Sequence, residues 1–328
     1  MFHARITGTG LYTPGIVETN EDLDRFYGKP IKDTFANKIG IYQRHITGNS
    51  ESTADMAAKA GEKAVMDAGI NPEDLGLVVV ATDTPEYLSP PTSCVVQGRL
   101  QAVNAGAYDI NGACSGFVAA LDAMCRIVIS GAHKHVLLVG AYNMTKFVDR
   151  ANASLVPLFG DGAGAVVVSR TEEERGFIGS ELYADGTQYD FMGIYAGGAK
   201  NPLTPERIAS KEYMLQSLKP LPADRNIKLW PPIITKLVEK YGFKTTDIDF
   251  IICTQINKWI IDTVMPILGL PMERTICIMG EYGYTGSACI PMALDTARKK
   301  LAKPKKGDNV VFIASGVGLA VASALFKW

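Results

Sequence analysis

The sequence predicts an α/β protein built from two similar halves. Short runs of β-branched residues alternate along the chain with longer helical segments, and one pattern of residues recurs at a nearly constant spacing. Alternation of this kind is typical of helices that cover a mostly parallel sheet, because apolar runs this continuous indicate strands buried on both faces. The recurrence indicates that the arrangement occurs twice.

The repeat is visible in three separate places. The matched positions are residues 74 and 247, residues 121 and 294, and residues 136 and 310, which lie 173, 173 and 174 positions apart. Short identities in apolar segments arise easily by chance, but a shared offset over some 60 residues does not. We therefore interpret the chain as a duplication of one supersecondary unit.

Each half has its own series of expected elements. In the first half we expect strands at 4–10, 75–82, 107–110 and 135–141 and helices at 51–69, 93–102 and 116–131. In the second half the expected strands are 177–185, 250–255, 275–279 and 310–316. The segment from about 187 to 224 is rich in Gly, Pro and Tyr and has no steady period. It predicts a long functional loop region that covers a substrate.

Composition excludes several classes of protein. The 328 residues include no run of 18 apolar residues, and the N-terminus lacks the layout of a signal peptide, so we expect neither a membrane protein nor a secreted one, and the cytoplasm is the expected location. A formal net charge of −1 argues against nucleic acid as a partner. The six cysteines form no CxxC pair and show no spacing to histidine that is typical of a metal site. We expect reduced thiols and no bound metal.

Cys114 is the strongest candidate for a nucleophile. It follows the expected strand 107–110 and precedes the helix 116–131, in the run DINGACSGF. In open α/β sheets, ligands bind beyond the carboxyl ends of the strands. At a helix N-terminus the thiol would meet unpaired N–H groups and the positive end of the helix dipole, which favours the thiolate. The alternative from local pattern alone is a buried structural cysteine.

Four motifs together resemble one known family. They are GACSGF around Cys114, FGDGAGAVVV at 159–168, TDTPEYLSPPTS at 82–93 and the C-terminal ASGVGLAVASALFKW. This combination resembles the ketoacyl-acyl carrier protein synthase III family of the thiolase superfamily, over essentially the whole chain. The resemblance implies a thiolase-like duplicated fold with α-β-α-β-α layers. It also implies an N-terminal half at 1–170, which carries the nucleophile, and a C-terminal half at 171–328.

The resemblance also implies an activity and partners. Members of the family are typically homodimers that load an acyl group from coenzyme A onto the cysteine. They then condense it with a malonyl acyl carrier protein and release carbon dioxide. The resemblance therefore implies acyl-coenzyme A as a substrate, no separate cofactor, and an acyl carrier protein as a partner.

Two positions depart from the family pattern. Thr254 stands where the resemblance places a catalytic histidine, and Tyr284 where it places a catalytic asparagine. Those two family residues stabilise the enolate formed as carbon dioxide leaves. Both hydroxyls can still donate hydrogen bonds to an oxyanion, but neither is a base near neutral pH. Because loss of one oxyanion donor costs a factor of about 100 to 1,000 in rate, we expect decarboxylative condensation to be slow.

Other roles carried over from the resemblance concern binding. Val317 falls where the family places the second oxyanion N–H, beside that of the nucleophile. Lys38 lies near a family arginine that contacts coenzyme A phosphates, and Thr34 or Phe35 lies where the family stacks the adenine. Asn257 matches a position near the pantetheine arm.

Asp83 is a candidate base. The offset places Ala81 opposite Thr254, and because strand side chains alternate, Asp83 should share the face of Ala81. Superfamily enzymes that resemble the hydroxymethylglutaryl-coenzyme A synthases use a glutamate from a comparable region. The alternative is a solvated loop aspartate beside Pro85.

Three functions therefore compete. The first is an acyl-transferring enzyme that forms a thioester on Cys114 and passes the acyl group to a carbon, oxygen or nitrogen nucleophile. The second is a standard fatty-acid-initiating synthase, in which Thr254 and Tyr284 do the usual work. The third is a non-catalytic partner subunit of a condensing enzyme, against which the intact Cys114 argues.

Overall fold

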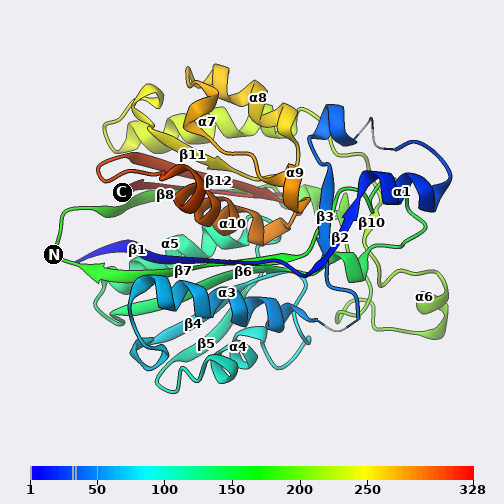
Figure 1. Ribbon diagram of the computed structural model, residues 1–328, viewed down its shortest axis with the longest axis horizontal. Coiled ribbons are helices and arrows are strands. Elements are labelled where there is room, and N and C mark those ends of the chain that lie inside the picture. Colours follow the sequence, from blue (N-terminus) through cyan, green and yellow to red (C-terminus); the bar gives the residue numbers. More distant parts are fainter. Residues whose placement is uncertain (1, 32, 34, 50) are drawn as a thin grey trace.

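Two mixed β-sheets, stacked with helices between them and on both outer faces, form the centre of the protein (Figure 1). The structure is a computed structural model that describes residues 2–31, 33, 35–49 and 51–328. The first sheet has the order β1-β7-β6-β4-β5, and the second the order β11-β12-β13-β8. The α-β-α-β-α layering expected from the resemblance is confirmed.

The strands of the two sheets come from separate parts of the chain. The first sheet contains β1 (His3–Tyr12), β4 (Leu77–Ala81), β5 (Gly106–Ile110), β6 (His135–Tyr142) and β7 (Gly162–Thr171). The second contains β8 (Gly176–Ala184), β11 (Phe250–Cys253), β12 (Asn309–Gly316) and β13 (Ala320–Lys327). The chain thus passes from one sheet to the other between β7 and β8. The division into domains at residue 170 stays a prediction.

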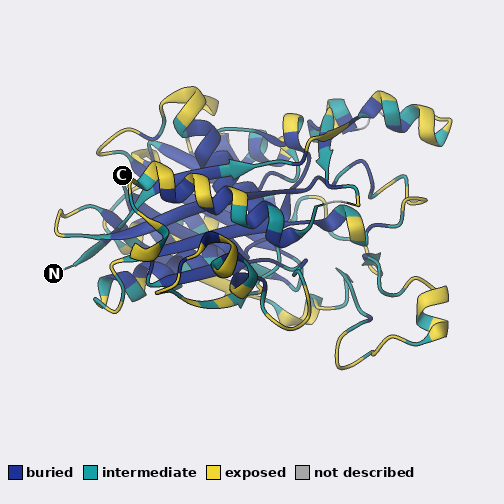
Figure 2. Ribbon diagram, turned by 60° about the horizontal axis from the view of Figure 1, so that its bottom comes forward, coloured by how far each residue is buried: buried dark blue, intermediate teal, exposed yellow. Residues whose placement is uncertain are grey.

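The helices form three layers around these sheets. On the outer face of the first sheet lie α3 (Thr53–Ala68) and α4 (Thr92–Leu100), and above the second lie α7 (Arg225–Lys240) and α8 (Lys258–Ile267) (Figure 1). Between the sheets lie α5 (Gly116–Ile129) and α10 (Cys289–Thr296). Figure 2 shows that burial is concentrated in the sheets and the helices between them. Within the described residues, no helix is long and apolar enough to cross a membrane.

Short elements complete the chain. A second pair of strands, β2 (Ile16–Thr19) and β3 (Gln43–Ile46), lies beside α1 (Asn20–Tyr27), and β9 (Met192–Gly193) pairs with β10 (Gln216–Ser217). The described residues also form the α-helices α6 (Pro205–Ala209) and α9 (Met279–Tyr282). The single turns of 3₁₀- or π-helix are η1 (Phe35–Ile39), η2 (Pro72–Asp74), η3 (Met144–Phe147), η4 (Gly186–Gln188), η5 (Thr245–Asp247), η6 (Met272–Arg274), η7 (Gly286–Ala288) and η8 (Ala297–Leu301).

The duplication is visible in local contacts. Asp74 accepts a hydrogen bond from the Asn71 N–H at 2.8 Å, and Asp247 accepts one from the Lys244 N–H at 2.8 Å. Both aspartates close a single helical turn that leads into a parallel strand, β4 or β11. The same short capping interaction therefore starts the equivalent strand in each half, which explains why this aspartate recurs in the sequence.

One expected strand is largely missing from the second half. Within 275–279 the structure has a single bridge, between Ile251 and Thr275, and α9 begins at Met279. The side chain of Gln255 supplies hydrogen bonds there instead. It donates to the Ile276 carbonyl at 3.0 Å and accepts from the Ile278 N–H at 2.7 Å. A side chain thus satisfies main-chain groups that a neighbouring strand would otherwise pair.

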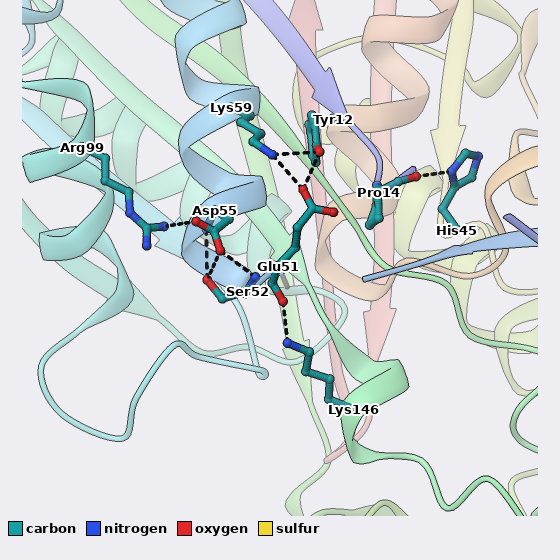
Figure 3. A network of polar contacts seen from close by, with 9 residues as sticks. All are labelled: Tyr12, Pro14, His45, Glu51, Ser52, Asp55, Lys59, Arg99 and Lys146. Carbon is teal, nitrogen blue, oxygen red and sulfur yellow. Dashed lines mark hydrogen bonds and ion pairs between the residues drawn. The ribbon is translucent and has the colours of Figure 1, made fainter. Parts of the chain in front are cut away.

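A polar network fixes the start of α3 (Figure 3). The Glu51 carboxylate accepts from the Tyr12 hydroxyl at 2.5 Å and from Lys59 at 2.7 Å, and Lys146 donates to the Glu51 carbonyl. Ser52 caps the helix through Asp55. The network joins β1, α3 and η3 at a partly exposed position, where its ion pair contributes little, roughly 0 to 1 kcal/mol.

Close packing between the layers predicts different costs at two glycines. A Cβ on Gly164 of β7 would lie 2.5 Å from the Met292 nitrogen of α10, whereas a Cβ on Gly98 of α4 would meet nothing within 4 Å. We expect Gly164→Ala to lower the free energy of unfolding by about 2 kcal/mol through overpacking. Gly98→Ala should raise it by about 0.5 to 1 kcal/mol, because alanine has the higher helix propensity.

Urea unfolding of the two variants beside the parent protein tests this expectation. Gly98→Ala is the matched control, since it adds the same methyl group. Equal stability of the two variants would show that β7 and α10 are not in close contact.

Candidate active site

A cavity of about 190 Å³ lies beyond the carboxyl ends of the central strands of both halves. Its wall includes four of the residues singled out in the sequence: Asp83 after β4, Cys114 after β5, Tyr284 after α9 and Val317 after β12. The other wall residues are Tyr142, Met144, Leu158, Phe159, Met192, Leu215, Leu221, Arg225, Asn226, Ile256, Ser315 and Gly316. The duplicated strands therefore bring widely separated residues to one place.

The turn that carries Cys114 is tight and depends on small residues. Ala113 has a φ of +48°, in the left-handed region that non-glycine residues rarely adopt. A Cβ on Gly112 would lie 2.9 Å from the Gly116 Cα, and a Cβ on Gly316 would lie 2.9 Å from the Cys114 nitrogen. The turn therefore presents Cys114 at the start of α5 and packs it against the end of β12.

The thiol of Cys114 is not held as a thiolate in this cavity. The residue is 7% exposed, and burial raises the pKa of the Cys114 thiol well above its ordinary value, with the Asp83 carboxylate raising it further. A hydrogen bond from the Tyr284 hydroxyl to the sulfur opposes this effect without cancelling it. Burial therefore opposes the thiolate that the helix N-terminus was expected to favour, and raises the pKa of the Cys114 thiol.

Asp83 faces this cavity as an unpaired carboxylate. One of its oxygens is buried without a hydrogen-bond partner, and burial raises the pKa of Asp83 to about 6. Its neighbours hold the loop in place: the Thr82 N–H donates to the Ile110 carbonyl at 3.2 Å, and Thr84 Oγ1 accepts from the Asn143 N–H at 2.9 Å. The geometry favours the predicted base over the alternative of a solvated loop aspartate. At neutral pH most of this carboxyl is ionised and can accept a proton.

Tyr284 is fixed by its main chain and by aromatic neighbours. Its N–H donates to the Leu158 carbonyl at 2.9 Å, and its carbonyl accepts from the Gly160 N–H at 3.0 Å. The ring lies 5.9 Å from the ring of Phe159 and 6.2 Å from that of Tyr142, centroid to centroid. Burial raises the pKa of Tyr284 well above its ordinary value, so the hydroxyl stays a hydrogen-bond donor.

Thr254 is not one of the described residues that line the cavity. Its side chain is 1% exposed, and its hydroxyl oxygen accepts a hydrogen bond from the Ser315 N–H at 3.0 Å. The expectation that the Thr254 hydroxyl faces an oxyanion beside Tyr284 is therefore not supported. Its bond instead holds the end of β12 against the end of β11.

The two N–H groups expected to bind an oxyanion, those of Cys114 and Val317, make no hydrogen bond to another described protein group. Val317 lines the cavity, and the close approach of Gly316 brings its segment to the Cys114 nitrogen. Over the described ranges, neither the Cys114 N–H nor the Val317 N–H donates a hydrogen bond to a protein acceptor. Both groups are therefore available to an oxygen that develops negative charge in the cavity.

Arg225, the first residue of α7, was not singled out by the sequence. It lines the cavity, one of its terminal nitrogens is buried without a hydrogen-bond partner, and burial lowers its pKa. The residue follows the irregular segment 187–224, where neither periodicity nor a motif indicates which side chains point inward. Its position beside the candidate nucleophile therefore comes from the structure alone.

No histidine of the chain, all four of which the structure describes, lines this cavity. His45 Nδ1 lies 2.7 Å from the Pro14 carbonyl, and His135 Nδ1 lies 2.8 Å from Ser169 Oγ. These two side chains are hydrogen-bonded away from the cavity. An imidazole base is thus absent from its wall.

A second, wider depression of about 750 Å³ holds two of the binding residues predicted from the resemblance, Lys38 and Asn257. Phe35 does not line it; this ring is 7% exposed and packs into the core. The alternative adenine contact, Thr34, lies outside the described residues. Exposed aromatic rings are supplied there by Trp259 and Tyr42 instead.

The depression, which we call the outer groove, adjoins the cavity along two segments. Ala223 and Asn257 line the outer groove, whereas Arg225 and Ile256 line the cavity. Near neighbours on the same two segments thus face one site or the other. This arrangement fits an elongated ligand that lies in the outer groove and extends toward Cys114.

Comparisons with known proteins identify the family of the chain. The sequence model of the family described as 3-oxoacyl-[acyl-carrier-protein (ACP)] synthase III matches residues 108–186, and that of its C-terminal part matches residues 238–328. The chain is 35% identical over 325 residues to the beta-ketoacyl-[acyl-carrier-protein] synthase III of Caldanaerobacter subterraneus subsp. tengcongensis. The aligned region covers 99% of this chain and 98% of that protein.

Solved structures give the same result. The 3-oxoacyl-[acyl-carrier-protein] synthase III of Aquifex aeolicus VF5 is similar with a TM-score of 0.86 and 32% identity, over 99% of this chain and 100% of that one. The priming beta-ketosynthase from the R1128 polyketide biosynthetic pathway is similar with a TM-score of 0.89 and 29% identity, over 99% and 96% of the two chains.

The half-buried Asp83, with one fully buried carboxylate oxygen, predicts a stability that depends on pH. Because its pKa is raised from 3.8 to about 6 in the folded protein, ionisation disfavours folding, and this penalty grows as the pH rises from 4 to above 6, where it reaches about 3 kcal/mol. We expect Asp83→Asn to raise the free energy of unfolding by roughly 2 to 3 kcal/mol at pH 7.5. The gain should shrink as the pH falls toward 4.

Denaturant unfolding at a series of pH values measures this difference. The matched control is Asp149→Asn, which removes an exposed carboxylate that pairs with Lys211 on the surface. A gain for Asp83→Asn that is the same at pH 4 and pH 7.5 would contradict the raised pKa.

Proposed function

Because the chain belongs to the 3-oxoacyl-[acyl-carrier-protein] synthase III family of condensing acyltransferases, we propose that Cys114 takes an acyl group from a coenzyme A thioester and passes it to an acceptor. The observation that carries this proposal is the juxtaposition of a buried thiol and an unpaired carboxylate, Asp83, in one cavity. The outer groove, with Lys38, Asn257 and Trp259, is where we place the coenzyme A part of the thioester.

The loading step follows from the ionisation of the two groups. Since the thiol of Cys114 is protonated at neutral pH, its proton passes to Asp83 as the sulfur attacks the thioester carbonyl. The N–H groups of Cys114 and Val317 stabilise the oxyanion that forms. The bond to the sulfur of coenzyme A then breaks, and the departing thiolate takes the proton from Asp83. This leaves an acyl group on Cys114 and the carboxylate regenerated.

The transfer step uses the same groups in the same order. The nucleophilic atom of the acceptor attacks the acyl carbonyl on Cys114, and Asp83 takes a proton from the acceptor in the same step. The carbon–sulfur bond breaks, and the proton returns from Asp83 to the sulfur. Tyr284, which donates a hydrogen bond to that sulfur, stabilises the departing thiolate in this step.

The second candidate is the standard condensation that the names of the relatives describe, with a malonyl carrier protein as acceptor. Its support is the similarity over nearly the full length of both chains. Thr254 does not line the cavity, and its hydroxyl oxygen accepts a hydrogen bond from the Ser315 N–H. For this reaction the Tyr284 hydroxyl alone would have to donate the hydrogen bonds that a histidine and an asparagine supply in the family. A non-catalytic role fits less well, because the turn around Cys114 and the open oxyanion donors are preserved.

A homodimer is part of the proposal. The strand β5 forms one edge of the first sheet and is only partly buried, with Tyr108 38% exposed. An open strand edge of this kind pairs readily with a second chain. Light scattering at micromolar concentration should give the mass of two chains.

Acyl loading tests the main proposal. After incubation with a panel of acyl-coenzyme A thioesters, intact-protein mass spectrometry should show the mass of one acyl group, which Cys114→Ala abolishes. Asp83→Asn should slow loading at least about 100-fold, in the range typical of a lost general base. The parent rate should rise with pH as Asp83 ionises near pH 6, and this rise should disappear in Asp83→Asn.

Asp149→Asn again serves as the control and should load at the parent rate. Loading that persists in Cys114→Ala would overturn the assignment of the nucleophile. Carbon dioxide release from malonyl carrier protein that keeps pace with acyl loading would favour the second candidate over the first.

A further inference from the structure

We infer that Arg225 binds a carboxylate of the acyl acceptor, so that the acceptor is an anionic molecule that keeps this carboxylate in the product. The inference rests on the proposed acyl transfer and names the class of molecule that receives the acyl group. It starts from a positive charge that lies in the cavity without a partner.

Arg225 has no ion pair or side-chain hydrogen bond within the described part of the chain, and one terminal nitrogen of its guanidinium is buried without any partner. The nearby carboxylate does not neutralise it: Asp83 also keeps an unpartnered oxygen, although both residues line the same cavity. Arg225 as a whole is half-buried, but a charged group whose donor nitrogen loses water without gaining a partner is unfavourable until a ligand supplies one. A guanidinium presents a planar fork of donors that matches a carboxylate.

The position of Arg225 is fixed by its neighbours on α7. Asn226 Oδ1 accepts a hydrogen bond from Ser315 Oγ at 2.9 Å, and Trp230 Nε1 donates to the same hydroxyl oxygen at 3.3 Å. Both bonds are buried and tie the first turns of α7 to the end of β12, beside Val317. The start of α7, from which the Arg225 side chain extends, is thus held beside the segment that contains Val317.

The cavity wall combines a few polar side chains with a larger number of apolar ones. Arg225 and Ile256 are near neighbours in sequence of Ala223 and Asn257, which line the outer groove. The rest of the wall is largely apolar, with Met144, Leu158, Phe159, Met192 and Leu215. An acyl chain on Cys114 fits the apolar part. The charge therefore belongs to a segment that lines both the cavity and the outer groove.

Retention of the carboxylate follows from the same charge. A guanidinium paired with a carboxylate stabilises the anion, whereas loss of carbon dioxide would remove the negative charge from that group. Asp83 supplies an alternative to decarboxylation, because it can take a proton from the acceptor. In the balanced step, the acceptor loses a proton to Asp83 and attacks the acyl carbon, and the carbon–sulfur bond breaks. The proton then returns to Cys114, and the carboxylate on Arg225 is unchanged.

A pair of alkylating reagents tests the carboxylate site directly. Iodoacetate and iodoacetamide both react with Cys114 through its thiolate, but only iodoacetate carries a carboxylate. The ratio of their rate constants at Cys114, measured by peptide mass spectrometry, is therefore independent of the fraction of thiolate. We expect Arg225→Gln to lower the ratio of iodoacetate to iodoacetamide at least tenfold, and Arg225→Lys to lower it less.

Lys228→Gln is the matched control, since it removes an exposed positive charge that pairs with Asp224 on the same helix. This variant should keep the parent ratio. Thermal melting of Arg225→Gln should show no loss of stability, because a half-buried charge with an unpartnered donor nitrogen has been removed. An unchanged ratio in a folded Arg225→Gln protein would overturn the inference, whatever the result for acyl loading.

Retention is tested on the acyl-enzyme. Cys114 is first loaded from a neutral acyl-coenzyme A, and discharge of the acyl group is then followed with acetoacetate or with methyl acetoacetate, its neutral ester. We expect acetoacetate to discharge the parent enzyme at least tenfold faster than the ester, with a product that retains the carboxylate, and this preference to be lost in Arg225→Gln. Equal rates of discharge with the two probes would refute the inference that the acceptor carboxylate binds Arg225. Release of carbon dioxide from acetoacetate at the rate of discharge would refute the inference that the product retains this carboxylate.

Failure of this inference can be told apart from failure of the proposed function. If the neutral acyl group does not load onto Cys114, the proposed acyl transfer itself is wrong. If it loads normally and the parent enzyme shows no preference for the carboxylate probe, only the role of Arg225 is wrong.

Discussion

The contact between the Cys114 turn and the end of β12 is the constraint on which the candidate site depends. Only glycine at position 316 allows it, because a Cβ there would lie 2.9 Å from the Cys114 nitrogen and 3.1 Å from the Ala113 Cβ. Cys114 belongs to the first half of the duplicated chain and Gly316 to the second. The site is therefore built at the junction of the halves, and neither half alone contains both N–H groups that can bind an oxyanion.

The polar groups of this site are arranged for a reacting ligand and not for stability. Asp83 and Arg225 each leave an atom unpartnered in a cavity whose remaining wall is mostly apolar. The same desolvation that raises the pKa of Cys114 also keeps Asp83 basic enough to take its proton. In the proposed mechanism, burial thus gives Asp83 the basicity to act in place of an imidazole, and the raised pKa lowers the folding free energy at neutral pH.

Much of the fold could be predicted from the sequence, because the repeat and the periodicity depend on local patterns. The matched aspartates 74 and 247 mark equivalent turns, and the small residues around Cys114 do form a tight turn at a helix start. The strand expected at 275–279 could not be judged locally, since Gln255, some 20 residues away, replaces its partner. The ionisation of Cys114 and the position of Arg225 depend on burial among distant segments, which no local pattern records.

The replacement of that strand by the Gln255 side chain makes the duplication unequal in a way that bears on assembly. In the first half, β5 continues the sheet and leaves an outer edge of main-chain N–H and carbonyl groups. At the equivalent place in the second half, an amide side chain occupies these groups. Each molecule thus presents this edge once. In the proposed homodimer, pairing through β5 would use this edge in both copies and leave no further β5 edge for a third chain.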